Sequence, residues 1–142
     1  MITVKKVEDK KGMLDFVKFP FSLYKDSKTW VPPLIADELD TLDPEKNPAF
    51  ENCEATFYLA YNEQQTIVGR IAVIVNHYEI SQGVPKVRFG WLDMVDNIAV
   101  TDALLQKALD KAKELGLKYA EGPMGFSNMD KVGIQTFGFE HI

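Results

Sequence analysis

Two carboxylates stand close together where a predicted strand ends and a predicted helix begins. They belong to Asp93 and Asp96 in the segment 92–97. A carboxylate at the end of a strand can act as a general base, because it can accept a proton from a reacting group. Asp96 and Asn97 are also suited to cap a helix, since their side chains accept hydrogen bonds from first-turn N–H groups. We take Asp93 and Asp96 as candidate catalytic residues, with capping of the helix as the alternative.

A second candidate site is the segment 122–126, which reads Gly-Pro-Met-Gly-Phe. It follows a predicted strand, and ligands of open sheets bind near the carboxyl ends of strands. Glycine also lets a backbone approach a ligand closely. The candidate ligand-binding residues are Gly122, Met124, Gly125 and Phe126. An ordinary turn is the alternative, because glycine and proline are the usual turn residues.

The sequence offers little to other chemistries. His77 and His141 are the only histidines, and neither has a second ligand at helical or zinc-finger spacing, so we predict no metal site. Cys53 is the single cysteine, which cannot form an intramolecular disulfide and is predicted to be a buried or idle thiol. The sequence has neither the Gly-x-Ser-x-Gly motif of hydrolases nor a phosphate-binding Gly-x-x-x-x-Gly-Lys loop.

Two further groups have a structural and a functional interpretation. The first is a set of acidic residues that we predict to form a solvated helix face, with binding of a cationic substrate or partner as the alternative. It comprises Asp37, Glu38, Asp40, Asp43 and Glu45. The second is Trp30, which stands beside two prolines and is predicted to anchor the core, with stacking against a ligand as the alternative.

Composition indicates one globular domain spanning residues 1–142. Of these residues 46% are hydrophobic, which is enough for one core. The 16 basic and 21 acidic side chains give a net charge of −5, so we do not expect nucleic acid as a partner. No apolar run is long enough for a signal peptide or a membrane span. We therefore expect a cytoplasmic protein that has no membrane partner.

The first third of the sequence predicts a strand and helices. Residues 2–7 alternate as in a strand, and a helix follows around residues 13–17. Pro20 is expected to stop or kink this helix and leave two short helical pieces. A further helix is predicted from Pro33 to about Leu42, and a turn follows.

The middle of the sequence predicts an antiparallel meander. β-Branched and aromatic residues dominate residues 55–61 and 66–78, and a third strand is expected over 86–95. Gly69 interrupts the second strand, which indicates a bulge or a close approach of another segment.

The most regular helical pattern follows this meander. Asn97 or Thr101 can cap the helix, and Gly116 ends it. Residues 117–121 then read as a strand, which should pair in parallel with the third strand of the meander. The predicted fold class is α+β, with a mostly antiparallel mixed sheet and flanking helices.

The sequence resembles the GNAT acyltransferase superfamily, in which this order of elements surrounds a V-shaped opening between the fourth and fifth strands. More narrowly, it resembles the N-terminal part of longer, uncharacterised bacterial GNAT-like proteins. The segments that carry this resemblance are 30–34 (Trp-Val-Pro-Pro-Leu), 47–50 (Asn-Pro-Ala-Phe), 68–72 (Val-Gly-Arg-Ile-Ala) and 122–126. The resemblance implies an acetyl-CoA-dependent N-acetyltransferase, with Asp93 and Asp96 where a base for an amine would lie.

The resemblance also places the coenzyme A pyrophosphate at the turn before the long helix. Members of the superfamily use a Gln/Arg-x-x-Gly-x-Gly/Ala loop there, because glycines let backbone N–H groups approach the anion. The corresponding segment contains no glycine, and its aspartates would repel phosphate. We therefore predict a degenerate loop. The residues at this position are Val95, Asn97, Ile98, Ala99, Val100 and Thr101.

Two further family features depart from the pattern. Many members protonate the leaving thiolate with a tyrosine on a helix after the fifth strand, but aligning Asn128 and Gly138-Phe139 with the family pattern puts Gln135 at that position. The sequence also stops before the last two strands of the family sheet, so we expect a missing C-terminal domain or a homodimer. A non-catalytic scaffold that pairs through the open sheet edge is the alternative function.

Overall fold

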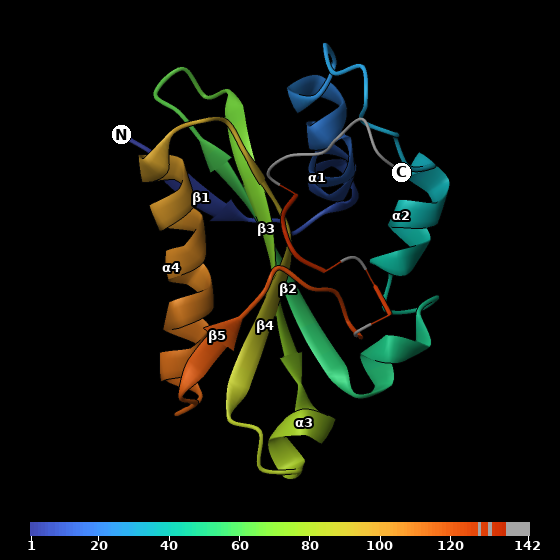
Figure 1. Ribbon diagram of the computed structural model, residues 1–142, viewed down its shortest axis with the longest axis vertical. Coiled ribbons are helices and arrows are strands. Elements are labelled where there is room, and N and C mark those ends of the chain that lie inside the picture. The colour runs from blue at the N-terminus through green and yellow to red at the C-terminus, as the bar shows by residue number, and fades with distance from the viewer. Residues whose placement is uncertain (128, 131, 136–142) are drawn as a thin grey trace.

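The chain forms a five-stranded mixed sheet with the strand order β1-β2-β3-β4-β5 (Figure 1). The computed structural model describes residues 1–127, 129–130 and 132–135. All neighbouring strands pair antiparallel except β4 and β5, which pair in parallel. This confirms the predicted α+β class and its single parallel step. The strands are β1 (Thr3–Lys6), β2 (Cys53–Tyr61), β3 (Ile67–Asn76), β4 (Lys86–Met94) and β5 (Tyr119–Glu121).

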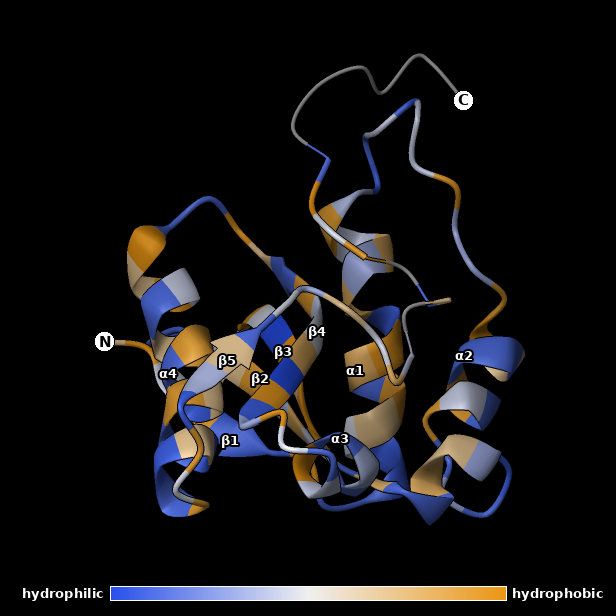
Figure 2. Cartoon of the chain, turned by 60° about the horizontal axis from the view of Figure 1, so that its bottom comes forward, coloured by the Kyte–Doolittle hydropathy of each residue, from blue (hydrophilic) through white to orange (hydrophobic). Residues whose placement is uncertain are grey.

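Helices cover both faces of the sheet. Helices α1 (Lys10–Leu23) and α2 (Ile35–Thr41) pack on one face, and α4 (Ile98–Glu114) packs on the other (Figure 1). Figure 2 shows that α1 and α4 each carry both hydrophobic and hydrophilic residues, as expected of helices with one face on a core. In the core between α1 and the sheet, Phe16 and Phe57 form an edge-to-face pair. In the core between α4 and the sheet, Val100 and Leu104 are fully buried.

Helix α1 continues through Pro20, so the prediction of two short helical pieces is wrong. It begins after Asp9, whose carboxylate caps the N–H of Gly12 at 2.7 Å. Proline has no N–H, so Pro20 leaves the carbonyl of Phe16 without its helical donor. The guanidinium Nη1 of Arg70 supplies the missing hydrogen bond at 2.9 Å. A contact from β3 therefore satisfies the carbonyl group that the proline leaves unpaired.

Two positions explain how α4 reaches the sheet. Asn97 caps this helix through a hydrogen bond from the N–H of Ala99 to its side chain, 2.9 Å long. Gly69 lies beneath the helix, where a Cβ atom would be 2.8 Å from Leu104 and 2.9 Å from Val100. The close approach predicted at Gly69 is confirmed, and the β2–β3 register also shifts opposite this stretch.

The strand predicted over residues 66–78 ends earlier than expected. It stops at Asn76, and residues His77–Ser81 form a short helix, α3. The side chain of Asn76 accepts a hydrogen bond from the N–H of Glu79 at 3.1 Å, which starts this helix. A short 3₁₀ helix, η1 (Pro48–Glu51), also precedes β2. Both are short helices that the sequence pattern did not separate from their neighbours.

Helix α3 brings Glu79 against Arg88 of β4. Nε and Nη2 of Arg88 donate to the two carboxylate oxygens of Glu79, and its Nη1 donates to the carbonyl of Gly125 at 3.4 Å. The side chain of Arg88 is only 6% exposed and that of Glu79 is 17% exposed. These hydrogen bonds lower the pKa of Glu79, and the same pairing raises the pKa of Arg88. The pair thus ties the segment after β5 to the sheet.

The substitution Glu79→Gln is expected to lower the free energy of unfolding by about 3 kcal/mol at pH 7, because it leaves Arg88 buried without its counter-charge. A lowered pKa stabilises the fold above the unfolded value, about 4.3, and this contribution is lost as the pH falls through the folded value. The difference between E79Q and the unsubstituted protein should therefore shrink from pH 6 to pH 3 in urea unfolding.

Glu54→Gln provides the control for this prediction. Glu54 contacts His77 at 2.8 Å, but its side chain is 72% exposed, so its loss should change stability by less than about 0.5 kcal/mol. An E79Q variant as stable as E54Q at pH 7 would show that the buried pair does not hold this part of the fold.

Candidate functional site

The site lies where β4 and β5 separate. Their pairing ends at Arg88 and Glu121, after which the chain turns through Gly122 and a cis peptide bond to Pro123. The N–H of Met124 still donates to the carbonyl of Phe89 at 2.8 Å. No β5 residue pairs with residues 89–94 of β4. This part of β4 therefore has an open edge toward the segment after β5.

Two glycines allow the segment after β5 to lie against β4. A Cβ atom at Gly90 would be 2.0 Å from the carbonyl oxygen of Met124, and one at Gly122 would be 2.2 Å from that of Phe89. Neither separation is possible for a real side chain, because each would place a carbon inside the carbonyl oxygen. The two positions require glycine for close packing.

A pocket of about 640 Å³ opens beside this part of β4, between the sheet and the segment that joins α1 to α2. Its walls come from α1, the 27–33 segment, α2, β3, β4 and the segment after β5. Three carboxylates and one guanidinium line it among the described residues, belonging to Glu38, Asp93, Asp130 and Arg70. Clefts of this size that combine apolar walls with a few polar groups are the usual ligand sites of proteins.

Asp93 lies at the centre of a hydrogen-bonded network in this pocket. Nε and Nη2 of Arg70 donate to its Oδ2 at 2.9 and 2.8 Å, and the hydroxyl of Tyr24 donates to its Oδ1 at 2.7 Å. Arg70 is 8% exposed and is the same residue that bonds to the carbonyl of Phe16. Asp93 thus joins α1, β3 and β4, and both its oxygens already accept strong hydrogen bonds.

Tyr24 keeps its proton in this arrangement. Partial burial and the hydrogen bond to Asp93 raise the pKa of its hydroxyl well above the ordinary value. A phenol whose proton is held by a carboxylate is a poor acid for a leaving group. The ring of Trp30 lies 5.4 Å from that of Tyr24 and 5.2 Å from that of Phe21, so Trp30 is both packed against aromatic neighbours and part of the pocket wall.

A β-bulge brings Trp91 into the pocket. Between Gly90 and Asp93, β4 has one more residue than the paired stretch of β3, and Trp91 has a φ of 47°. A positive φ is unfavourable for a bulky residue and persists only where surrounding contacts hold it. The indole Nε1 of Trp91 donates to Oε2 of Glu38 at 3.1 Å, which ties the bulge to α2.

The other predicted catalytic residue lies elsewhere. Asp96 is exposed and does not line the pocket. It does not provide the capping side chain either, since Asn97 does. The predicted pair is therefore divided between the pocket and the surface.

The predicted coenzyme A turn leads directly into α4. The N–H groups of Ala99, Val100 and Thr101 all hydrogen-bond to Asn97, the first to its side chain and the other two to its carbonyl. The side chain of Val100 is fully buried, whereas that of Ile98 is 74% exposed. These backbone donors are already paired within the first turn.

The predicted ligand-binding segment contributes to the pocket in part. Met124 and Gly125 line it. Phe126 is 5% exposed and packs against Trp91 and Phe50, and Gly122 lies against Phe89. The segment thus combines a wall of the pocket with an anchor in the core.

The remaining candidates have structural surroundings. Cys53 is buried at the start of β2, and this burial raises the pKa of its thiol. Within the described part of the chain, no group of three or more His, Cys, Asp or Glu residues could hold a metal ion. The same residues include no helix long and apolar enough to cross a membrane.

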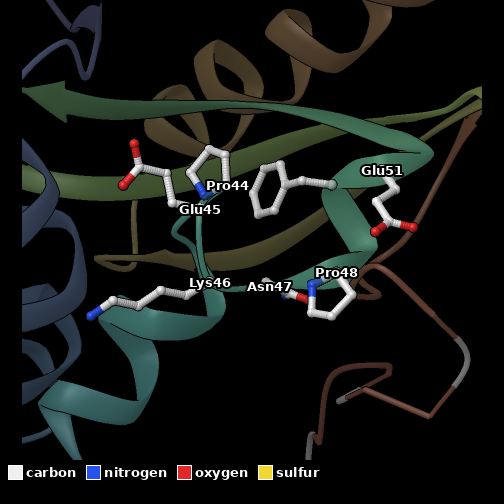
Figure 3. A pocket seen from close by; sticks show the side chains of 7 residues that line it. Pro44, Glu45, Lys46, Asn47, Pro48 and Glu51 are labelled. Carbon is white, nitrogen blue, oxygen red and sulfur yellow. The ribbon is translucent and has the colours of Figure 1, made fainter.

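A second hollow of about 300 Å³ lies over the turn before β2 and is lined by residues 44–48, 50 and 51. In Figure 3 its charged side chains, Glu45, Lys46 and Glu51, point away from one another. Lys46 pairs with Asp40 at 3.0 Å, and Asn47 bonds to the backbone. This hollow presents no convergent set of polar groups.

The helix expected after β5 is absent from the described residues, where 122–127, 129–130 and 132–135 form turns, bends and irregular backbone. Gly133 has a φ of 86°, which a helix does not allow. Gln135 lines the pocket. Asn128, Gly138, Phe139 and His141, which were also considered in the sequence, lie outside the described residues.

Three side chains that make hydrogen bonds in the pocket were not singled out from the sequence, namely Tyr24, Arg70 and Trp91. Glu38 was considered only as one member of an acidic group. Arg70 had one sequence signal, since an arginine among the β-branched residues of a central strand needs a buried partner. The partner of Trp91 depends on the bulge, for which the sequence has no comparable marker.

This sheet, in which β4 diverges from β5, has the fold of the GNAT acyltransferases. An acetyltransferase of the GNAT family from Staphylococcus aureus Mu50 superposes with a TM-score of 0.59 and 18% identity, over 87% of this chain and 74% of that one. A predicted acetyltransferase from Clostridium acetobutylicum, in a crystal structure with acetyl-CoA, gives a TM-score of 0.54 and 13% identity over 84% and 79%.

Two curated proteins are similar to the chain in sequence. The bacterial ceramide synthase of Caulobacter vibrioides is 29% identical over 127 residues, which cover 88% of this chain and 33% of that protein. Protein YghO of Escherichia coli K12 is 31% identical over 134 residues, covering 93% and 34%. The chain thus spans about a third of the length of these curated relatives. No protein-family model matches it.

Proposed function

We propose that the chain is part of a cytoplasmic acyl-CoA-dependent N-acyltransferase whose acceptor amine enters the pocket beside β4. The observation that carries this proposal is the position of the pocket, which lies at the open edge of β4 and has more carboxylates than cations among its described lining residues. An acidic pocket favours an amine over an anionic acceptor. The ceramide synthase relative fits this reaction class, because a ceramide is an amide.

The proposed roles of the chain's own residues follow from their contacts. Acyl-CoA would supply an activated thioester for attack by the neutral amine, so an ammonium form would first lose a proton to solvent. The amide bond would form as the C–S bond breaks, and coenzyme A would leave as a thiol with the second proton of the amine. Both carboxylate oxygens of Asp93 accept hydrogen bonds, one from Arg70 and one from Tyr24. Asp93 is therefore better suited to hold the pocket wall in place than to transfer a proton to solvent. Its role as general base, like that of Asp96, stays a prediction.

The proposal includes weak anchoring of the coenzyme A pyrophosphate before α4. The N–H groups of residues 99–101 are paired with Asn97, and the turn offers the exposed carboxylate of Asp96. Each missing charge-assisted hydrogen bond withholds about 1.5–3 kcal/mol of binding energy. The acyl chain or the remaining length of the protein would then have to supply more of the affinity for acyl-CoA.

The test is acyl transfer by the full-length protein, followed as thiol release from acetyl-CoA and from a longer acyl-CoA in the presence of a primary amine. Asp96→Asn should bind acyl-CoA about two- to fivefold more tightly, because it removes a like charge near the phosphates. Asp110→Asn, on an exposed turn of the same helix, serves as the matched control and should change nothing.

Absence of thiol release with every acyl-CoA would refute the transferase proposal. If the protein also showed no stabilisation by acyl-CoA in thermal unfolding, and formed dimers that a proline in β5 abolished, the non-catalytic scaffold would be favoured. Bound ligand at 100 times its dissociation constant should add about 2.7 kcal/mol of stability. Equal acyl-CoA affinity of D96N and D110N would refute anchoring of the pyrophosphate at this turn.

A further inference from the structure

The described lining residues of the pocket include three carboxylates but only one cation, Arg70. Arg70 and Asp93 neutralise one another. Asp130 accepts a hydrogen bond from the N–H of Ser127 at 2.9 Å and packs against Gly125, so its carboxylate holds the segment after β5 in place. Glu38 is the remaining charged group among the described lining residues. No cation of the described chain pairs with it.

Glu38 is nevertheless held in a fixed position. Its Oε2 accepts the indole N–H of Trp91 at 3.1 Å, and the backbone of Trp91 is set by the bulge in β4. Its Oε1 has no hydrogen-bond partner among the described residues. One oxygen is thus tethered to the sheet, while the other is available to a ligand in the pocket.

Exposed apolar side chains line the same pocket as this carboxylate. Val31 and Ile134 line it while remaining 78% and 64% exposed. Trp30 and Pro33 add further apolar surface to the wall. Exposed apolar side chains around a cleft mark a surface that binds an apolar ligand. A ligand that matches both features has a cationic head and an apolar body.

We propose that Glu38 is the residue that recognises the acceptor, by binding the ammonium group of a primary amine whose apolar body lies against Trp30, Val31 and Ile134. This inference rests on the proposed function for the identity of the acceptor. It assigns to Glu38 the selection of a charged over a neutral head group, and to Trp91 the positioning of Glu38. Hydrogen bonds between ions are about twice as strong as neutral ones, which gives such a site its selectivity.

The experiment measures binding of hexylamine, which carries an ammonium group at neutral pH, and of 1-hexanol to the full-length protein by calorimetry without acyl-CoA. We expect hexylamine to bind at least about tenfold more tightly than hexanol, and Glu38→Gln to abolish this preference. Trp91→Phe keeps an aromatic ring but removes the N–H, and should weaken hexylamine binding about three- to tenfold. Asp37→Asn, on the exposed side of α2, is the control and should bind as the unsubstituted protein does.

The outcomes separate this inference from the proposed function. Equal binding of hexylamine to E38Q and D37N, or equal affinity for hexylamine and hexanol, would overturn the role of Glu38 even if acyl transfer is observed. Hexylamine binding that depends on Glu38, in a protein that transfers no acyl group, would uphold the amine site and refute the transferase. If transfer occurs, E38Q should raise KM for the amine about tenfold, whereas D37N should leave KM unchanged.

Discussion

Asp93→Ala is expected to lower the free energy of unfolding by about 3–5 kcal/mol, because it leaves the guanidinium of Arg70 buried without its counter-charge. Arg70 is 8% exposed and also bonds to the carbonyl that Pro20 leaves unpaired in α1. Loss of Asp93 would thus loosen the contact between α1 and the sheet at the pocket. Urea unfolding of the two proteins measures this difference.

Asp96→Ala is the matched control for this prediction. Asp96 is also an aspartate near the end of β4, but it is exposed, so its loss should change stability by less than about 0.5 kcal/mol. The double variant Arg70→Met with Asp93→Leu should recover only part of the loss, because it removes both charges but also the donor to the carbonyl of Phe16. Equal stability of D93A and D96A would show that the Arg70–Asp93 pair does not stabilise the fold.

The second large effect is expected from Gly90→Ala, which should cost about 3 kcal/mol. The added Cβ would lie 2.0 Å from the carbonyl oxygen of Met124, so the segment after β5 must move away from β4. That movement would break the hydrogen bond from Met124 to Phe89 and displace a wall of the pocket. We expect a lower urea midpoint together with altered chemical shifts of the Met124 methyl group.

Gly83→Ala separates this clash from backbone strain. Gly83 has a φ of 84° but no atom within 4 Å of the position of a Cβ, so its replacement should cost only about 1 kcal/mol, from the left-handed backbone. A G90A variant no less stable than G83A would mean that the contact between β4 and the segment after β5 is not tightly packed.

The two predictions concern the same part of the molecule from opposite sides. Asp93 connects β4 to α1, and Gly90 admits the backbone of Met124. A variant at either position is expected to change the pocket as well as the stability. Glu38 lies outside both contacts, because it reaches β4 through the side chain of Trp91. Its replacement should therefore alter binding with little loss of stability.

Much of the fold could be predicted from the sequence because its signals are local. The alternation of the strands, the apolar stripe of α4 and the cap at Asn97 each depend on residues close together in the chain. The order of these elements then restricts the topology, including the parallel step to β5. The prediction that Pro20 divides α1 was wrong, because the effect of this proline depends on Arg70, which is 50 residues further along the chain.

What the sequence determined by itself is therefore the five strands, helix α4 and their order, the acidic balance and the absence of glycine from the turn before α4. Only the tertiary structure decided which residues form the pocket. It placed Asp93 inside and Asp96 outside, and it brought Glu38, Tyr24 and Arg70 to β4 from other elements. The reason is physical: secondary structure follows from neighbouring residues, whereas a pocket follows from contacts whose register depends on a bulge, a missing helical N–H and the packing of whole elements.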